Sequence, residues 1–209
     1  MAISYPLSTP TNIGIANIAF SAENAVAISQ SPFTYQQQVV AHPGQRWSAS
    51  ISLPPMKRQD AEYWVAFLLS LKGQVGTFLL GDPNCVVPQG AAATAPGTPL
   101  VNGANQIGDT LNIDGLPSAL ANYFLPGDYI QLGATSSATL HKVLTATTSS
   151  GGGAAALDIW PSIRTAPADD SAVVLVGAKG RFRLKENMTQ WQINDISSYG
   201  ITFDCVEAI

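Results

Sequence analysis

The two histidines and two cysteines are the residues with the widest chemical repertoire. His42 lies in a Pro-Gly stretch typical of a turn, and His141 lies in a stretch that alternates like a strand. Such positions explain both histidines better than a general base with its partner does. Cys85 and Cys205 lack metal-type or redox-type spacing, so we expect both to be reduced, with a pairing between them left open. No nucleophile elbow and no phosphate loop occurs. The sequence therefore predicts no catalytic residue, no metal site and no cofactor.

Carboxylates could act in pairs, as in glycosidases. Asp169 and Asp170 are adjacent, and neighbours in an extended segment point to opposite sides. Asp109, Asp114 and Asp128 each stand beside a glycine, which is ordinary loop chemistry. A calcium site is the alternative, but the twelve-residue loop pattern is missing. We therefore interpret these aspartates as loop residues.

One charged pattern could form a contact. Arg181, Arg183 and Lys185 alternate with Phe182 and Leu184, so the three cations share one face of a predicted strand. This face is either solvated or in contact with acidic side chains of a neighbouring subunit. Three charges on a net-acidic chain release few counterions, which makes nucleic-acid binding the least favoured reading.

Four aromatic residues of the middle segment could form a surface for stacking. Tyr123, Phe124, Tyr129 and Trp160 could bind a sugar or a partner loop there, with Tyr123, Tyr129 and Trp160 as the candidate surface residues. Packing in a core is the favoured alternative.

Composition limits the classes of function. The chain has 209 residues, of which 46% are apolar and only 11% charged, against about 25% charged in typical soluble proteins. We therefore expect other subunits to cover uncharged parts of the surface. A net charge of −4 argues against general nucleic-acid binding. No apolar run approaches the ~20 residues that span a membrane, and the polar start lacks a signal-peptide pattern, so we expect the protein to stay in the cytoplasm where it is made.

The first third predicts strands and one helix. Residues 13–20 form an apolar run, and residues 42–45, His-Pro-Gly-Gln, predict a turn. The alternation from Trp47 to Leu53 is typical of a strand with one buried face. A helix is predicted from about Arg58 to Leu71, where apolar residues recur at helical spacing and Lys72-Gly73 ends it. The three tryptophans outside the middle segment are predicted to lie in a core: Trp47, Trp64 and Trp191.

The middle of the chain differs from both ends. Residues 1–81, 82–178 and 179–209 carry net charges of +1, −5 and 0. Five short strands are predicted in the acidic part, which suggests a small barrel or sandwich: Thr110–Ile113, Tyr129–Leu132, Thr139–Thr145, Ala155–Trp160 and Ala172–Val176. The final segment holds about three strands, too few for a core of its own, so we expect it to pair with the first segment.

These patterns predict a mainly β protein with one main helix. A β-sandwich or split-barrel core, formed by residues 1–83 and 178–209, is interrupted by an inserted small β-barrel domain of residues 84–177. Insertions are tolerated at exposed turns, and Asp82-Pro83 is such a turn.

The order of pieces resembles the distal tail proteins of long-tailed bacteriophages (siphophages). The resemblance rests on residues 45–55, the helix at 60–73 and the strand end at 76–83, and it covers residues 13–83 and, more weakly, 179–209. It implies a non-enzymatic structural protein of the virion, made in the host bacterial cytoplasm. Six copies would form a ring at the tail tip, joining the tail tube protein to the baseplate hub, other tail-tip proteins and the receptor-binding apparatus.

Two alternatives stay open. A tail tube or tail terminator protein can use a similar core, although an acidic insert would obstruct the stacking of many rings. A carbohydrate-binding or hydrolytic module that contacts the host envelope would depend on the aromatic residues and aspartates between 109 and 170.

Overall fold

The chain is mainly β, with one α-helix and two sheets. The computed structural model describes residues 3–195 and 197–209. The larger, eight-stranded sheet, with its helix, is called the body. Its strands are β1 (Leu7–Ser8), β2 (Asn17–Gln30), β3 (Gln37–Ser52), β4 (Met56–Lys57), β5 (Phe78–Leu80), β12 (Gly180–Leu184), β13 (Trp191–Ile193) and β14 (Ser198–Glu207). Their main order is β1-β5-β12-β14-β3-β2, so strands from both ends of the chain pair side by side.

The second sheet has six strands and forms a nearly closed barrel, called the barrel below. Its strands are β6 (Leu100–Val101), β7 (Gly108–Asp114), β8 (Tyr129–Leu132), β9 (Thr139–Val143), β10 (Ala155–Ile163) and β11 (Val173–Val174). An isolated bridge between Leu100 and Ala172 connects the two end strands. Two short 3-10 helices, Ala91–Ala93 and Thr135–Ser137, lie between strands. All five strands predicted for this segment are present, and the short β6 was not predicted.

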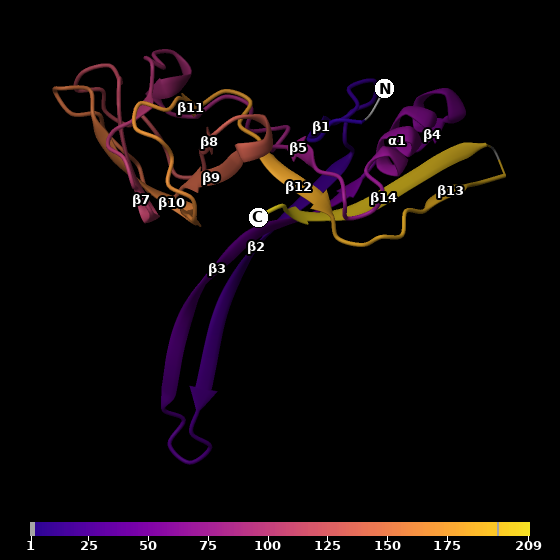
Figure 1. Cartoon of the computed structure of the whole chain (residues 1–209), viewed down its shortest axis with the longest axis horizontal. Coiled ribbons are helices and arrows are strands. Elements are labelled where there is room, and N and C mark those ends of the chain that lie inside the picture. Colours follow the sequence, from indigo (N-terminus) through magenta and orange to yellow (C-terminus); the bar gives the residue numbers. More distant parts are fainter. Residues whose placement is uncertain (1–2, 196) are drawn as a thin grey trace.

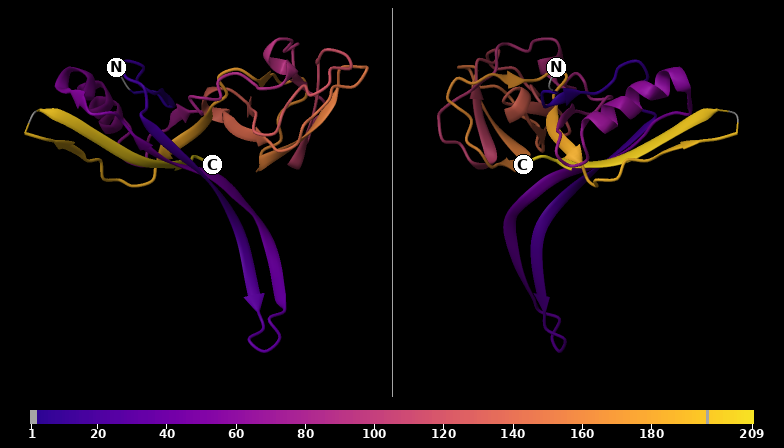
Figure 2. Two further views of the ribbon diagram at one scale, coloured as in Figure 1. Left: turned by 180° about the vertical axis from the view of Figure 1, so that it is seen from behind. Right: turned by 45° about the vertical axis from the view of Figure 1, so that its right-hand side comes forward.

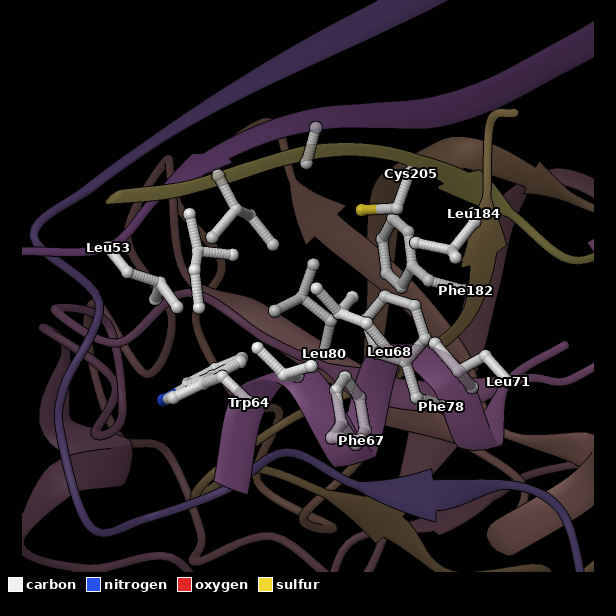
Figure 3. Close-up of a cluster of buried hydrophobic side chains, with 14 of the residues drawn as sticks. Leu53, Trp64, Phe67, Leu68, Leu71, Phe78, Leu80, Phe182, Leu184 and Cys205 are labelled. Carbon is white, nitrogen blue, oxygen red and sulfur yellow. The ribbon is translucent and has the colours of Figure 1, made fainter. Parts of the chain in front are cut away.

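Helix α1 (Arg58–Ser70) covers one face of the body sheet (Figure 1). Its side chains Phe67 and Leu68 point toward Phe78 of the sheet, and Trp64 lies beside Phe67 (Figure 3). These side chains are buried, because the helical spacing seen in the sequence places them on one face. The helix ends within a residue of the predicted position, and Lys72 and Gly73 then adopt positive φ angles.

Two of the three tryptophans predicted for the core are there. Trp47 is 5% exposed and Trp64 is 1% exposed, and the alternation from Trp47 to Leu53 buries one face of β3, as predicted. The prediction for Trp191 is wrong, because this residue lies on β13, which pairs only with β14, and 37% of it is exposed.

The predicted turn at residues 42–45 is also wrong, because these residues lie inside β3. The ladder pairs Asn24 with Gln45 and then Val26 with Ala41, so Ala25 faces three residues, His42, Pro43 and Gly44. This bulge accommodates the proline, which cannot donate a ladder hydrogen bond. A Cβ on Gly44 would lie 3.0 Å from the Cβ of Ala25, which explains a glycine there. Pro-Gly thus interrupts the ladder without reversing the chain.

Candidate assembly site: the projecting arm

The distal parts of β2 and β3 form a long two-stranded arm. We define the arm as residues 24–45, where β3 pairs only with β2, because β14 pairs with β3 at residues 48–52. The arm leaves the body and points away from helix α1 and from the barrel (Figure 1), and the other views show the same direction (Figure 2). Both outer edges of this ribbon lack a neighbouring strand within the described residues.

The arm carries no Asp, Glu, Lys or Arg. The nearest charges are Glu23 and Arg46, which face each other across the ladder and form an ion pair at its base, with Arg46 Nε 2.6 Å from Glu23 Oε2. Soluble proteins usually protect exposed strand edges with charges or a short strand. This arm has neither protection, and its bulge lies only at its base.

One face of the arm is apolar and exposed. Val26 and Ile28 alternate on β2, and the register places Val39 opposite Ile28, so the three side chains share one face. Their exposed fractions are 49%, 62% and 57%. An isolated two-stranded hairpin is marginally stable in water. The arm therefore exposes an apolar face that nothing in the described chain covers.

The tip of the arm presents two aromatic side chains. Phe33 is 91% exposed and Tyr35 is 73% exposed. The tip is an ordered turn, because the backbone N–H of Ser31 donates to the carbonyl of Gln36 at 2.9 Å. The Ser31 hydroxyl also accepts from the N–H groups of Phe33 and Thr34. The aromatic rings are thus held at the far end of the arm by the turn.

Two residues of the predicted cation strip, Arg181 and Arg183, lie on β12 with the predicted alternation, and Lys185 directly follows this strand. Phe182 and Leu184 are buried, while Arg181 and Arg183 are half-buried and Lys185 is exposed. The guanidinium of Arg181 donates within the chain, to the carbonyls of Ala208 and Ser136. The Arg181 guanidinium is therefore already hydrogen-bonded within its own chain. Among the described residues no ion pair involves Arg183 or Lys185, and a contact of these two with a neighbouring subunit stays a prediction.

Of the three residues of the candidate stacking surface on the barrel, two are buried and one is half-buried. Tyr123 is fully buried and its hydroxyl donates to the Pro96 carbonyl, and burial raises its pKa to about 12. Tyr129 is 4% exposed and packs against the body. Trp160 is half-buried between barrel and body. Tyr129 belongs to the apolar core of the body and Tyr123 to that of the barrel. Packing in a core, the alternative favoured from the sequence, therefore describes these two residues.

A cavity of about 700 Å³ opens between barrel and body. Its lining includes Ile163, Pro167, Val174 and Ala208, and no Phe, Tyr or Trp of the described chain contributes to it. Sugar-binding sites commonly stack the ligand on an aromatic ring, and this cavity offers none.

The remaining reactive residues are dispersed. His141 is buried, while Cys85 is half-buried and Cys205 buried, both as free thiols. Asp128 accepts two backbone N–H bonds, as loop aspartates do. Across residues 3–195 and 197–209, no group of three His, Cys, Asp or Glu side chains is placed to hold a metal ion.

Sequence reasoning missed the arm as a functional element. The available signals were the uncharged stretch between Glu23 and Arg46 and the alternation of Val26 with Ile28. Both were hidden because the Pro-Gly pair suggested a turn.

Neither a scan against protein-family models nor a search of curated proteins finds a match to this chain. The one α-helix of the described chain is too short and too polar to cross a membrane.

Proposed function

We propose that this protein is a non-enzymatic structural subunit that assembles with copies of itself through its arm. The arm carries the proposal, because its apolar face, unpaired edges and lack of charge are costly for a free monomer and favourable in an assembly. Arms of neighbouring copies lying edge to edge would complete the ladder of each edge strand. A closed arrangement of this kind leaves no free edge.

Together with the resemblance of residues 13–83 to distal tail proteins, this supports a ring in a phage virion. In this proposal the protein forms a ring at the distal end of the tail, with six copies by analogy with that family. It would join the tail tube to the baseplate hub and the receptor-binding apparatus. The barrel lies beside the body rather than along the arm (Figure 1), and this leaves the arm free for such contacts.

The test compares the oligomeric state of the wild type with that of a variant whose arm carries two charges. Ile28→Lys/Val39→Lys places two like charges directly opposite each other on the apolar face. We expect native mass spectrometry and electron microscopy to show closed rings for the wild type. For the variant we expect at least a roughly tenfold lower ring fraction, with an unchanged circular dichroism spectrum.

The matched control is Ile107→Lys, which changes an isoleucine of the barrel segment that is at least as exposed as Ile28. It should assemble like the wild type. A wild-type protein that stays monomeric, or a charged arm that assembles normally, would contradict the proposal. Long tubes in place of single rings would favour the tail tube alternative.

A further inference from the structure

Two tryptophans connect the barrel with the base of the arm. Trp47 of β3 donates its indole N–H to the carbonyl of Leu140 in the barrel, at 2.9 Å. Trp160 of β10 donates in the opposite direction, to Oδ1 of Asn24, also at 2.9 Å. The two rings meet edge to face with centroids 4.5 Å apart. Each unit therefore donates one directional hydrogen bond to the other.

An arginine completes this connection. Arg164, just beyond β10, lies with Nη2 2.5 Å from Oε1 of Glu207, and its Nη1 donates to the Gln45 carbonyl. The side chain of Gln45 accepts from the backbone N–H of Ser162 at 2.7 Å. The other oxygen of Glu207 accepts from the N–H of Trp47 at 3.1 Å. Burial raises the pKa of Glu207, and the Arg164 charge opposes that rise.

These contacts meet at one point of the arm. Asn24 and Gln45 face each other in the ladder, and they are the last regular pair before the bulge at Ala25. Leu140 and Tyr129 of the barrel also pack into the core of the body. The barrel is thus attached to the body on one side and holds the base of the arm on the other.

We infer that the inserted barrel is a brace that fixes the direction in which the arm leaves the body. A two-stranded ribbon twists easily, and a bulge interrupts its ladder. Without these lateral contacts only the ladder would hold the pair Asn24–Gln45 from which the arm departs. Arg164, Trp160, Asn24 and Gln45 are the positioning residues of this brace. The consequence for ring geometry depends on the proposed function, but the restraint on the arm does not.

The test measures the arm in the monomer. Spin labels are placed at Ser29 of the arm and Gln59 of helix α1, both exposed, in the Ile28→Lys/Val39→Lys background with Cys85→Ser. The brace variant is Arg164→Met/Glu207→Gln, in which the amide that replaces the carboxylate still offers an acceptor to the backbone N–H of Trp47. We expect the interspin distance distribution from pulsed electron paramagnetic resonance to become about twofold broader than with the brace intact.

The matched control is Glu23→Gln/Arg46→Gln. This removes the neighbouring ion pair, which connects β2 and β3 at the base of the arm and, within the described residues, makes no side-chain hydrogen bond to the barrel. It should keep the narrow distribution. Should the Arg164 variant fail to fold, Asn24→Ala/Gln45→Ala provides the same measurement, since neither side chain belongs to a hydrophobic core.

A narrow distribution in the brace variant, or in Asn24→Ala/Gln45→Ala where the first does not fold, would overturn the brace. A wild type that forms no rings would overturn the proposed function only, because the distances are measured in monomers.

Discussion

His141 is a buried polar residue whose two ring nitrogens both have partners. Nδ1 lies 2.7 Å from the Pro161 carbonyl, and Nε2 lies 2.9 Å from the Thr139 hydroxyl. Nδ1 therefore carries the proton and donates, while Nε2 accepts from the hydroxyl. Burial lowers the pKa of His141 to about 4, and the nearby Arg164 charge adds to this effect. The neutral ring is thus a structural part of the junction between barrel and body.

The pKa of His141 predicts how stability depends on pH. As pH falls below 6.5, the unfolded chain binds a proton that the folded chain excludes until about pH 4. Stability is therefore lost across that window, by about 3 kcal/mol. The variant His141→Gln should lose less stability over the same pH range, as measured by urea unfolding at several pH values. The raised pKa of Glu207 acts in the opposite direction but is present in both proteins.

The control for this prediction is His42→Gln, which replaces the exposed histidine of the bulge. It should unfold with the pH dependence of the wild type. If the free energy of unfolding fell equally steeply with pH for the wild type and for His141→Gln, this would contradict a buried neutral histidine.

Among the elements, the arm depends on its bulge for its path. β2 and β3 keep one register up to Asn24–Gln45 and another from Val26–Ala41 onward, and the second register is displaced by two residues on β3. Bulges bend the strand that contains the extra residues and increase its twist. The direction of the arm therefore follows from the bulge together with the contacts at its base.

Deleting Pro43 and Gly44 should remove the bulge without unfolding the arm. The deletion brings both registers into one continuous ladder, and an even number of removed residues keeps every side chain on its face. We expect a folded protein whose arm takes a new direction. The label pair on Ser29 and Gln59 would detect this as a shifted but narrow distance. Removing Pro43 alone is the comparison, because it should flip the distal side chains of β3 and destabilise the arm.

The helix and the strand from Trp47 to Leu53 were predictable because burial imprints a local period on the sequence. The arm was not, because both faces of its strands are largely exposed in the monomer, so burial leaves no period of two in their sequence. A Pro-Gly pair looks the same in a turn and in a bulge, and only the flanking ladder distinguishes them. The contacts of the brace join residues 136 and 119 positions apart, which no local pattern reveals.

At the scale of the whole molecule, the chain leaves the body and returns to it at adjacent strands. β5 and β12 are antiparallel neighbours, with Leu80 paired to Gly180. Gly81 lies so close to Ala178 that a Cβ on it would be 2.2 Å from that carbonyl oxygen. The intervening residues form their own apolar cluster around Leu111, Ile130 and Ile159. The division at residues 83 and 178 stays a prediction about folding units, and excision of the barrel tests it.

Replacing residues 84–177 with a short Gly-Ser loop should turn β5 and β12 into a hairpin and leave the body folded. Trp47 would lose contacts, because its neighbours Leu140, Tyr129 and Trp160 would be absent. In the full chain, Trp47→Thr should cost about 3 kcal/mol. In the excised body the cost should be smaller, since only partners such as Phe20 remain. Urea unfolding of the four proteins gives this comparison. An excised chain that is unfolded would contradict a body that folds without its barrel, and an equal cost in both backgrounds would mean that the barrel does not support Trp47.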